Sequence, residues 1–267
     1  MAVKVLRRMA ATAPAPVFVA RGGGAGLLPL ELAADPRVTL VASPRHASVL
    51  LAAGRFPGAM GEALGRVHDQ LLRARITVWW TADADAGRPA ALPAASVVTG
   101  ADPVDAVLSA HRNTVLGDAG AEDAVGADEP PNPFEGRGDY GQGGEGMMGG
   151  VPFGRPMAMT GDDRDGLALD RLTVTFGPFL PGFGNGLRLR AVLQGGVVQE
   201  AEVELLDLGT GPWLPGLDPD DHVRHDLRWL AEALRLGGLP ALGCRSAMLA
   251  RTGPGAPVLA GLARRVR

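Results

Sequence analysis

The chain has 267 residues, of which 46% are hydrophobic and 21% charged, so it holds enough apolar material for a sizeable core. Its formal net charge of -3 and its 4% aromatic content argue against a nucleic-acid partner, which calls for a basic surface or for rings that stack on bases. The single cysteine, Cys244, can form neither an internal disulfide nor a four-thiolate cluster, and it indicates a reducing compartment such as the cytoplasm.

The first part of the chain alternates between strand-like and helix-like segments. Short apolar runs predict strands at 16–20, 38–43, 76–80 and 95–100. Helical spacing and start signals predict helices at 3–11, 27–34, 57–74 and 102–112. The last of these should begin with Asp102 as its cap and Pro103 in the first turn. This alternation predicts an α/β domain with an open, mostly parallel sheet over residues 1–112.

Residues 113–167 break this rhythm with an acidic stretch rich in glycine and proline. The segment is too polar to form a core, so it is either a solvated linker or an extended arm laid over a partner. The large apolar side chains of Met147, Met148 and Phe153 favour the arm, because a solvated linker rarely carries them. These three residues are therefore candidate interface residues.

The third part, residues 168–267, predicts a small antiparallel hairpin followed by helices. Alternating apolar residues predict half-buried strands at 168–178 and 187–195, and a tight turn at Gly195-Gly196 leads into the returning strand at 197–207. Helices are expected at 222–237, capped by Asp220 or Asp221, at 239–251 and at 256–266. Cys244 falls among small apolar residues of the second helix, so we expect it to be packed rather than reactive.

The runs RGGGAGLLPLEL, VTLVASPRHAS and GADP follow one another in the order seen in a known family. They resemble the small, cluster-bearing subunit of respiratory complex I and of the energy-converting membrane-bound hydrogenases. The resemblance puts the first two cluster cysteines at Leu27 and Leu28, or at Ala25 and Leu28, and the last at Ala101, with Glu31 in the acidic position. No cysteine stands at these positions or in TADADAG, the run directly after the strand ITVWW, so the resemblance implies a degenerate cluster site and no cofactor.

The run VTFGPFLPGFGNGLRLRAVLQGGVVQEAEVEL resembles the start of the large, quinone-site subunit of the same family. Gly177-Pro178 and Gly186-Leu187-Arg188-Leu189 match its pattern, but the histidines of its loop are missing. The family's loop lies at the junction with the membrane part. The resemblance therefore makes Phe179, Leu180 and Phe183 candidate interface residues.

Taken together, the two resemblances imply a non-catalytic structural subunit of a complex-I-like or antiporter-like membrane assembly, without a redox centre of its own. Its partners would be membrane subunits of that type in a hetero-oligomer on the cytoplasmic face. No window approaches the ~20 apolar residues of a membrane-spanning helix, so the attachment should be peripheral. The alternative is a flavin- or nucleotide-binding α/β enzyme that cradles a phosphate on the N–H groups of the Gly22–Gly26 loop, although this loop lacks the full dinucleotide-binding spacing.

Overall fold

The structure is a computed structural model of the chain, and it describes residues 2–71, 76–83, 89, 92, 95–117, 159–162, 166–214, 217–218 and 220–253. The chain divides into two compact units, each made of separate stretches. The first unit comprises Met1–Glu122, Gly177–Leu187 and Leu205–Arg267, and the second comprises Asp123–Phe176 and Arg188–Glu204. These bounds differ from the expected parts 1–112, 113–167 and 168–267, because the 177–187 loop and the C-terminal helices belong to the same compact unit as the parallel sheet.

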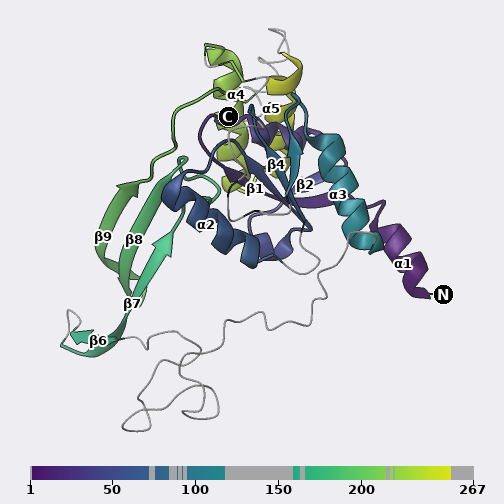
Figure 1. Cartoon of the computed structure of the whole chain (residues 1–267). Coiled ribbons are helices and arrows are strands. Elements are labelled where there is room, and N and C mark those ends of the chain that lie inside the picture. Colours follow the sequence, from purple (N-terminus) through teal and green to yellow (C-terminus); the bar gives the residue numbers. More distant parts are fainter. Residues whose placement is uncertain are drawn as a thin grey trace. The chain divides into compact units, whose positions relative to one another are not determined.

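The first unit is built on a five-stranded parallel sheet with the order β2-β1-β3-β4-β5, and it confirms the predicted α/β class (Figure 1). The strands are β1 (Ala15–Arg21), β2 (Val38–Leu40), β3 (Val49–Ala53), β4 (Ile76–Trp80) and β5 (Ser96–Val98). Strand β3 was not predicted. All five of its residues are buried, so its sequence VLLAA lacks the alternation that marks a half-buried strand.

Helices cover both faces of this sheet, since successive strand residues point to opposite sides. Val17, Leu51 and Trp80 face α3 (Val104–Leu116) and the 3₁₀ helix η1 (Leu28–Ala34). Phe18, Leu50 and Trp79 face α2 (Gly58–Asp69) on the other side. The segment predicted as a helix at 27–34 is thus a 3₁₀ helix, and the helix predicted at 102 begins at Val104, whose N–H donates to Asp102 Oδ1 at 2.9 Å.

The N-terminal helix α1 (Ala2–Ala10) lies beside α3, as Figure 1 shows at the N-terminal end of the chain. Its contact with α3 is carried in part by His111, whose Nε2 lies 3.3 Å from the carbonyl oxygen of Ala10. The apolar side chains of α1 remain exposed in the described structure, Leu6 by 63% and Met9 by 65%.

Two C-terminal helices complete the first unit, as the sequence predicts. Helix α4 (His222–Leu236) is capped by Asp221, whose Oδ1 accepts from Arg224 N at 3.0 Å, and α5 (Pro240–Thr252) packs against it and against η1. Cys244 lies on the exposed side of α5, so the expectation that it is packed was wrong. The helix expected at 256–266 lies outside the described residues.

The second unit is a four-stranded sheet with the order β6-β7-β8-β9, in which β6, β7 and β8 pair antiparallel. Its strands are β6 (Met159–Asp162), β7 (Ala168–Phe176), β8 (Leu187–Gln194) and β9 (Val197–Leu205). Strand β6 lies within the segment expected to be an arm, and Gln194 Nε2 donates to its Gly161 carbonyl oxygen at 2.6 Å. Strand β7 was expected to be half-buried, yet Leu172 is 53% and Phe176 37% exposed in the described structure.

Candidate functional site

The glycine loop at residues 22–26 follows β1 and uses most of its own N–H groups. Gly22 N donates to Ala53 O at 2.7 Å, Gly23 N to Arg55 O at 2.9 Å, and Ala25 N to Gly22 O at 3.3 Å. The element after the loop is a 3₁₀ helix rather than an α-helix, so the loop does not present a helix N-terminus to an anion. Its geometry therefore gives no support to a phosphate cradle.

The chain's own residues 207–214 lie directly on this loop. Leu214 N donates to Gly24 O at 2.9 Å, and the Arg55 guanidinium donates to Pro212 O and to Gly209 O. A Cβ atom at Gly23 would stand 1.9 Å from the Leu208 carbonyl oxygen. The glycine is thus required for the close approach of this segment.

This position is also the ordinary ligand site for the observed strand order. In open α/β sheets, ligands bind outside the carboxyl ends of the strands where the strand order reverses, here between β1 and β3. The loops that follow these two strands are joined by a bridge between Gly23 and Arg55 and are covered by residues 207–214. The segment therefore fills the crevice that a cofactor would occupy.

The four degenerate cluster positions lie at this same edge of the sheet. Ala25, Leu27 and Leu28 are buried, with exposed fractions of 0%, 4% and 6%, whereas Ala101 is exposed in the loop after β5. Ala25 and Leu28 share a core cluster with Leu214. Alanine and leucine carry no atom that binds iron, so the residues present do not fit an iron–sulfur cluster.

Glu31, the acidic residue that the resemblance singled out, forms a buried ion pair with Arg228 of α4. Its Oε1 accepts from Arg228 Nε and Nη2, both at 2.7 Å, and the two residues are 9% and 2% exposed. The carboxylate therefore fastens α4 onto η1. The sequence offered no signal for this pair, because the two residues lie far apart in the chain.

The loop at 178–183 holds three of the interface candidates, and these three residues differ in how deeply they are buried. Phe179 is only 8% exposed and packs edge-to-face on Phe56, with ring centroids 5.9 Å apart. It belongs to the core, so its assignment to a docking surface is corrected. Leu180 and Phe183 are half-buried. The other candidates, Met147, Met148 and Phe153, lie outside the described residues.

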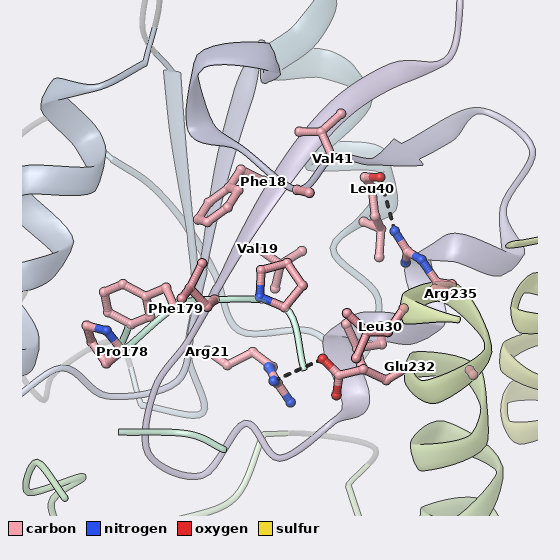
Figure 2. Close-up of a pocket in the computed structure, with 15 residues that line it drawn as sticks. Phe18, Val19, Arg21, Leu30, Leu40, Val41, Pro178, Phe179, Glu232 and Arg235 are labelled. Atoms are coloured by element: carbon pink, nitrogen blue, oxygen red, sulfur yellow. Dashed lines mark hydrogen bonds and ion pairs between the residues drawn. The ribbon is translucent and has the colours of Figure 1, made fainter. Parts of the chain in front are cut away.

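A cavity of about 180 Å³ opens beside β1 in the first unit (Figure 2). Most of its lining is apolar and comes from β1, η1, the end of β2, the 178–181 loop and α4. The apolar lining includes Phe18, Val19, Leu30, Leu40, Val41 and Leu180. Three charged side chains complete the wall, namely Arg21, Glu232 and Arg235.

These charged groups are held by one another and by the backbone. Arg21 Nη2 lies 3.3 Å from Glu232 Oε1, which also accepts from Gly182 N at 2.9 Å, and Arg21 donates to Phe183 O at 3.0 Å. Burial lowers the pKa of Arg21, and the neighbouring Glu232 carboxylate acts in the opposite direction. Burial likewise lowers the pKa of Arg235, and the neighbouring Cys244 and Glu232 act in the opposite direction. Arg235 Nη2 donates to Leu40 O at 3.1 Å.

Sequence reasoning missed this group of residues. A signal was present in α4, where Arg228, Glu232 and Arg235 follow one another at helical spacing next to the buried Leu227, Ala231 and Leu234. Such a charged stripe is usually solvated, so the pattern alone predicts an outer face. Arg21 stands at the end of an apolar strand, and this position gives no sign in the sequence that its side chain is buried against α4.

Comparisons with protein-family models, with curated proteins and with solved structures found no match for this chain. In the described part of the chain, no helix is both long and apolar enough to cross a bilayer. No group of three or more histidine, cysteine, aspartate or glutamate residues is arranged there to hold a metal ion.

Proposed function

We propose that the chain is a non-catalytic structural subunit of a complex-I-like or antiporter-like membrane assembly, with no redox centre of its own. Its partners are membrane subunits of that type, and it attaches through them to the cytoplasmic face. The proposal rests on the resemblance of the two sequence segments to the small and large subunits of that family. Ion translocation or energy conversion would be carried out by the assembly as a whole.

One observation carries the proposal beyond the resemblance. The carboxyl edge of the parallel sheet is closed by residues 207–214, which follow the segment that resembles the large subunit. Leu214 is 2% exposed and packs with Ala25 and Leu28, two of the positions at which the resemblance expects thiolates. Under the resemblance this edge corresponds to a cofactor pocket, and its filling by the chain's own apolar side chains supports a structural rather than a catalytic role.

The docking surface is narrower than the sequence alone suggested. Phe179 is buried, which leaves Leu180 and Phe183 as the described candidates in this loop. The backbone of the loop is held independently of the Phe183 ring, since Phe183 O accepts from Arg21 and Gly182 N donates to Glu232. Phe183 can therefore be changed while the hydrogen bonds of its loop stay in place.

The test is co-purification from membranes in the native host. The tagged full-length chain should be recovered in the membrane fraction with polytopic antiporter-like subunits, and without stoichiometric iron. Phe183→Asp should lower that recovery at least about tenfold, because a charge at the centre of an interface is costly to desolvate. Trp229→Asp is the matched control, since Trp229 is a 45% exposed aromatic residue on α4.

Two results would contradict the proposal. The first is a wild-type chain that is a soluble monomer at native expression levels and has no membrane partner. The second is iron and acid-labile sulfide bound in near-stoichiometric amounts. If Phe183→Asp co-purifies as fully as Trp229→Asp, the loop is not the docking surface.

A further inference from the structure

We propose that the cavity beside β1 binds a small organic monoanion, a carboxylate on a hydrocarbon body of about the size of a benzene ring. The site is separate from the closed crevice at the glycine loop. The inference does not depend on the proposed function, because it uses the charges, donors and size of the cavity alone.

The charge of the cavity wall favours an anion. The ionisable side chains in its lining are Arg21, Arg235 and Glu232, so two positive charges face one negative charge and leave an excess of one positive charge. Guanidinium groups stay protonated in proteins even when burial lowers their pKa. Arg21 is buried and paired with Glu232, which leaves the charge of the half-buried Arg235, and one carboxylate would supply its counter-charge.

The hydrogen-bond donors of the two arginines point to the same ligand class. Within the described residues, Arg21 donates to Phe183 O and Glu232 through Nη2, and Arg235 donates to Leu40 O, also through Nη2. The buried side-chain nitrogens that lack a partner there belong to Arg55 and Arg245. The remaining nitrogens of Arg21 and Arg235 therefore keep access to solvent and can donate to a carboxylate.

The carboxylate of Glu232 is less available to a ligand than the arginines. Its Oε1 is taken by Arg21 and Gly182 N, and its Oε2 is buried without a partner in the described structure. A ligand atom cannot reach a fully covered oxygen unless the wall moves. This disfavours a cationic ligand, which would need that oxygen. Figure 2 shows the Glu232 side chain turned toward Arg21.

The volume of the cavity and its apolar lining indicate the size and the hydrocarbon character of the ligand. The volume of about 180 Å³ is small beside the cavities that hold drug-sized molecules, which start at roughly 300 Å³. A dry cavity of about 150 Å³ lined by apolar side chains is enough to hold benzene. Phe18, Val19 and Leu30 supply a comparable apolar wall here, next to the two arginines.

The experiment measures binding of benzoate, benzyl alcohol and benzylamine to the full-length chain by titration calorimetry. Benzoate should bind at least about tenfold more tightly than benzyl alcohol, and benzylamine should bind most weakly, because bonds to a charged partner are the stronger ones. Arg235→Gln should weaken benzoate binding at least about tenfold while changing benzyl alcohol binding by less than about twofold. Arg66→Gln, which removes an exposed arginine on α2, should change neither.

A second variant keeps the test informative if Arg235→Gln folds poorly. Leu180→Trp adds volume to a half-buried residue of the cavity wall, and should abolish binding of both benzoate and benzyl alcohol. Circular dichroism and thermal unfolding check that each variant is folded. The proposal is overturned if benzoate does not bind at millimolar concentration, if benzylamine binds as tightly as benzoate, or if Leu180→Trp leaves benzoate binding unchanged.

Discussion

Two buried ion pairs of the first unit lie where α4 meets the rest of that unit. Glu31 with Arg228 and Arg21 with Glu232 are ion pairs whose members are at most about one-tenth exposed. Removing charges from water costs several kcal/mol per ion, so such pairs add little net stability but are damaging when one member is lost. Their effect is to fix the position of α4.

The Glu31–Arg228 pair gives the first prediction. Glu31→Ala leaves Arg228 buried without a counter-charge and should lower the free energy of unfolding by about 3–5 kcal/mol. The double change Glu31→Leu with Arg228→Met should recover most of that loss, because two apolar groups then replace the pair. Urea unfolding followed by the fluorescence of the buried Trp79 and Trp80 measures both effects.

The exposed pair of Asp221 and Arg224 is the control for this measurement. Arg224 Nε lies 3.2 Å from Asp221 Oδ2, but both side chains are at least one-third exposed. Arg224→Ala should therefore cost no more than about 1 kcal/mol. A Glu31→Ala variant that loses no more than Arg224→Ala would contradict the role assigned to the buried pair.

His111, on α3, is hydrogen-bonded both to the end of α1 and to Ser48, the residue before β3. Its Nδ1 lies 2.8 Å from Ser48 Oγ, and its Nε2 lies 3.3 Å from Ala10 O. The carbonyl can only accept, so the neutral ring carries its proton on Nε2. Its Nδ1 then accepts from the Ser48 hydroxyl, whose other acceptor within reach is Pro16 O at 3.2 Å. Burial lowers the pKa of His111; the bond to Ala10 opposes this shift and nearby Arg112 reinforces it.

The lowered pKa of His111 predicts a loss of stability in acid. The pKa of this residue in the folded chain lies below its unfolded value of 6.5, so the unfolded chain takes up the proton first as the pH falls. The contribution of His111 is therefore complete above about pH 6.5 and declines from there toward its folded pKa. Unfolding midpoints measured between pH 8 and about 5 should fall less in His111→Gln than in the wild type, with exposed His46→Gln as control. Equal slopes in both variants would contradict this account.

At the scale of elements, the next prediction concerns the contact between the glycine loop and residues 207–214. Gly23→Ala would bring a Cβ atom to 1.9 Å from the Leu208 carbonyl oxygen, which is backbone and cannot turn aside. We expect a loss of more than about 2 kcal/mol in the free energy of unfolding. Gly184→Ala, where a Cβ would meet nothing within 4 Å, should change stability by less than about 1 kcal/mol. Similar losses in the two variants would mean that residues 207–214 do not lie on the loop.

Which elements could be predicted depended on how local their signals are. Strand β4 was predicted from its apolar run and helix α4 from its capping aspartate. The turn was predicted from the Gly195-Gly196 pair, and Gly195 indeed has a positive φ of 57°. Strand β3 was missed because a fully buried strand lacks alternation. Strand β6 was missed because its sequence MTGD is polar and gives no local sign of its pairing with β7.

The candidate site was harder to predict than the fold, for a physical reason. Its charged residues come from β1 and α4, about two hundred residues apart in the chain. Charges on a helix ordinarily face water, and only the packing of α4 on the rest of the unit buries Glu232 and half-buries Arg235. Nothing local distinguishes these two residues from solvated neighbours.

At the scale of the whole molecule, the first unit is assembled from stretches at both ends of the chain. Phe179, Leu206 and Leu214 come from the later stretches and are each at most 8% exposed within the core of the parallel sheet. Burying one such side chain contributes about 1.5–3 kcal/mol, so the three together supply roughly 5–9 kcal/mol. That amount is comparable with the entire stability of an ordinary domain, about 5–15 kcal/mol.

The fragment 1–117 should therefore fail to fold by itself, although it contains all five strands of the parallel sheet. It lacks the three core side chains and leaves Glu31 without Arg228. We expect it to unfold without a cooperative transition and to lose the near-ultraviolet dichroism of Trp79 and Trp80. Co-expression with the fragment 177–253 should restore both, because that piece returns the missing side chains and α4. A fragment 1–117 that unfolds cooperatively at the midpoint of the full chain would show that the strands and helices of 1–117 form an independent domain.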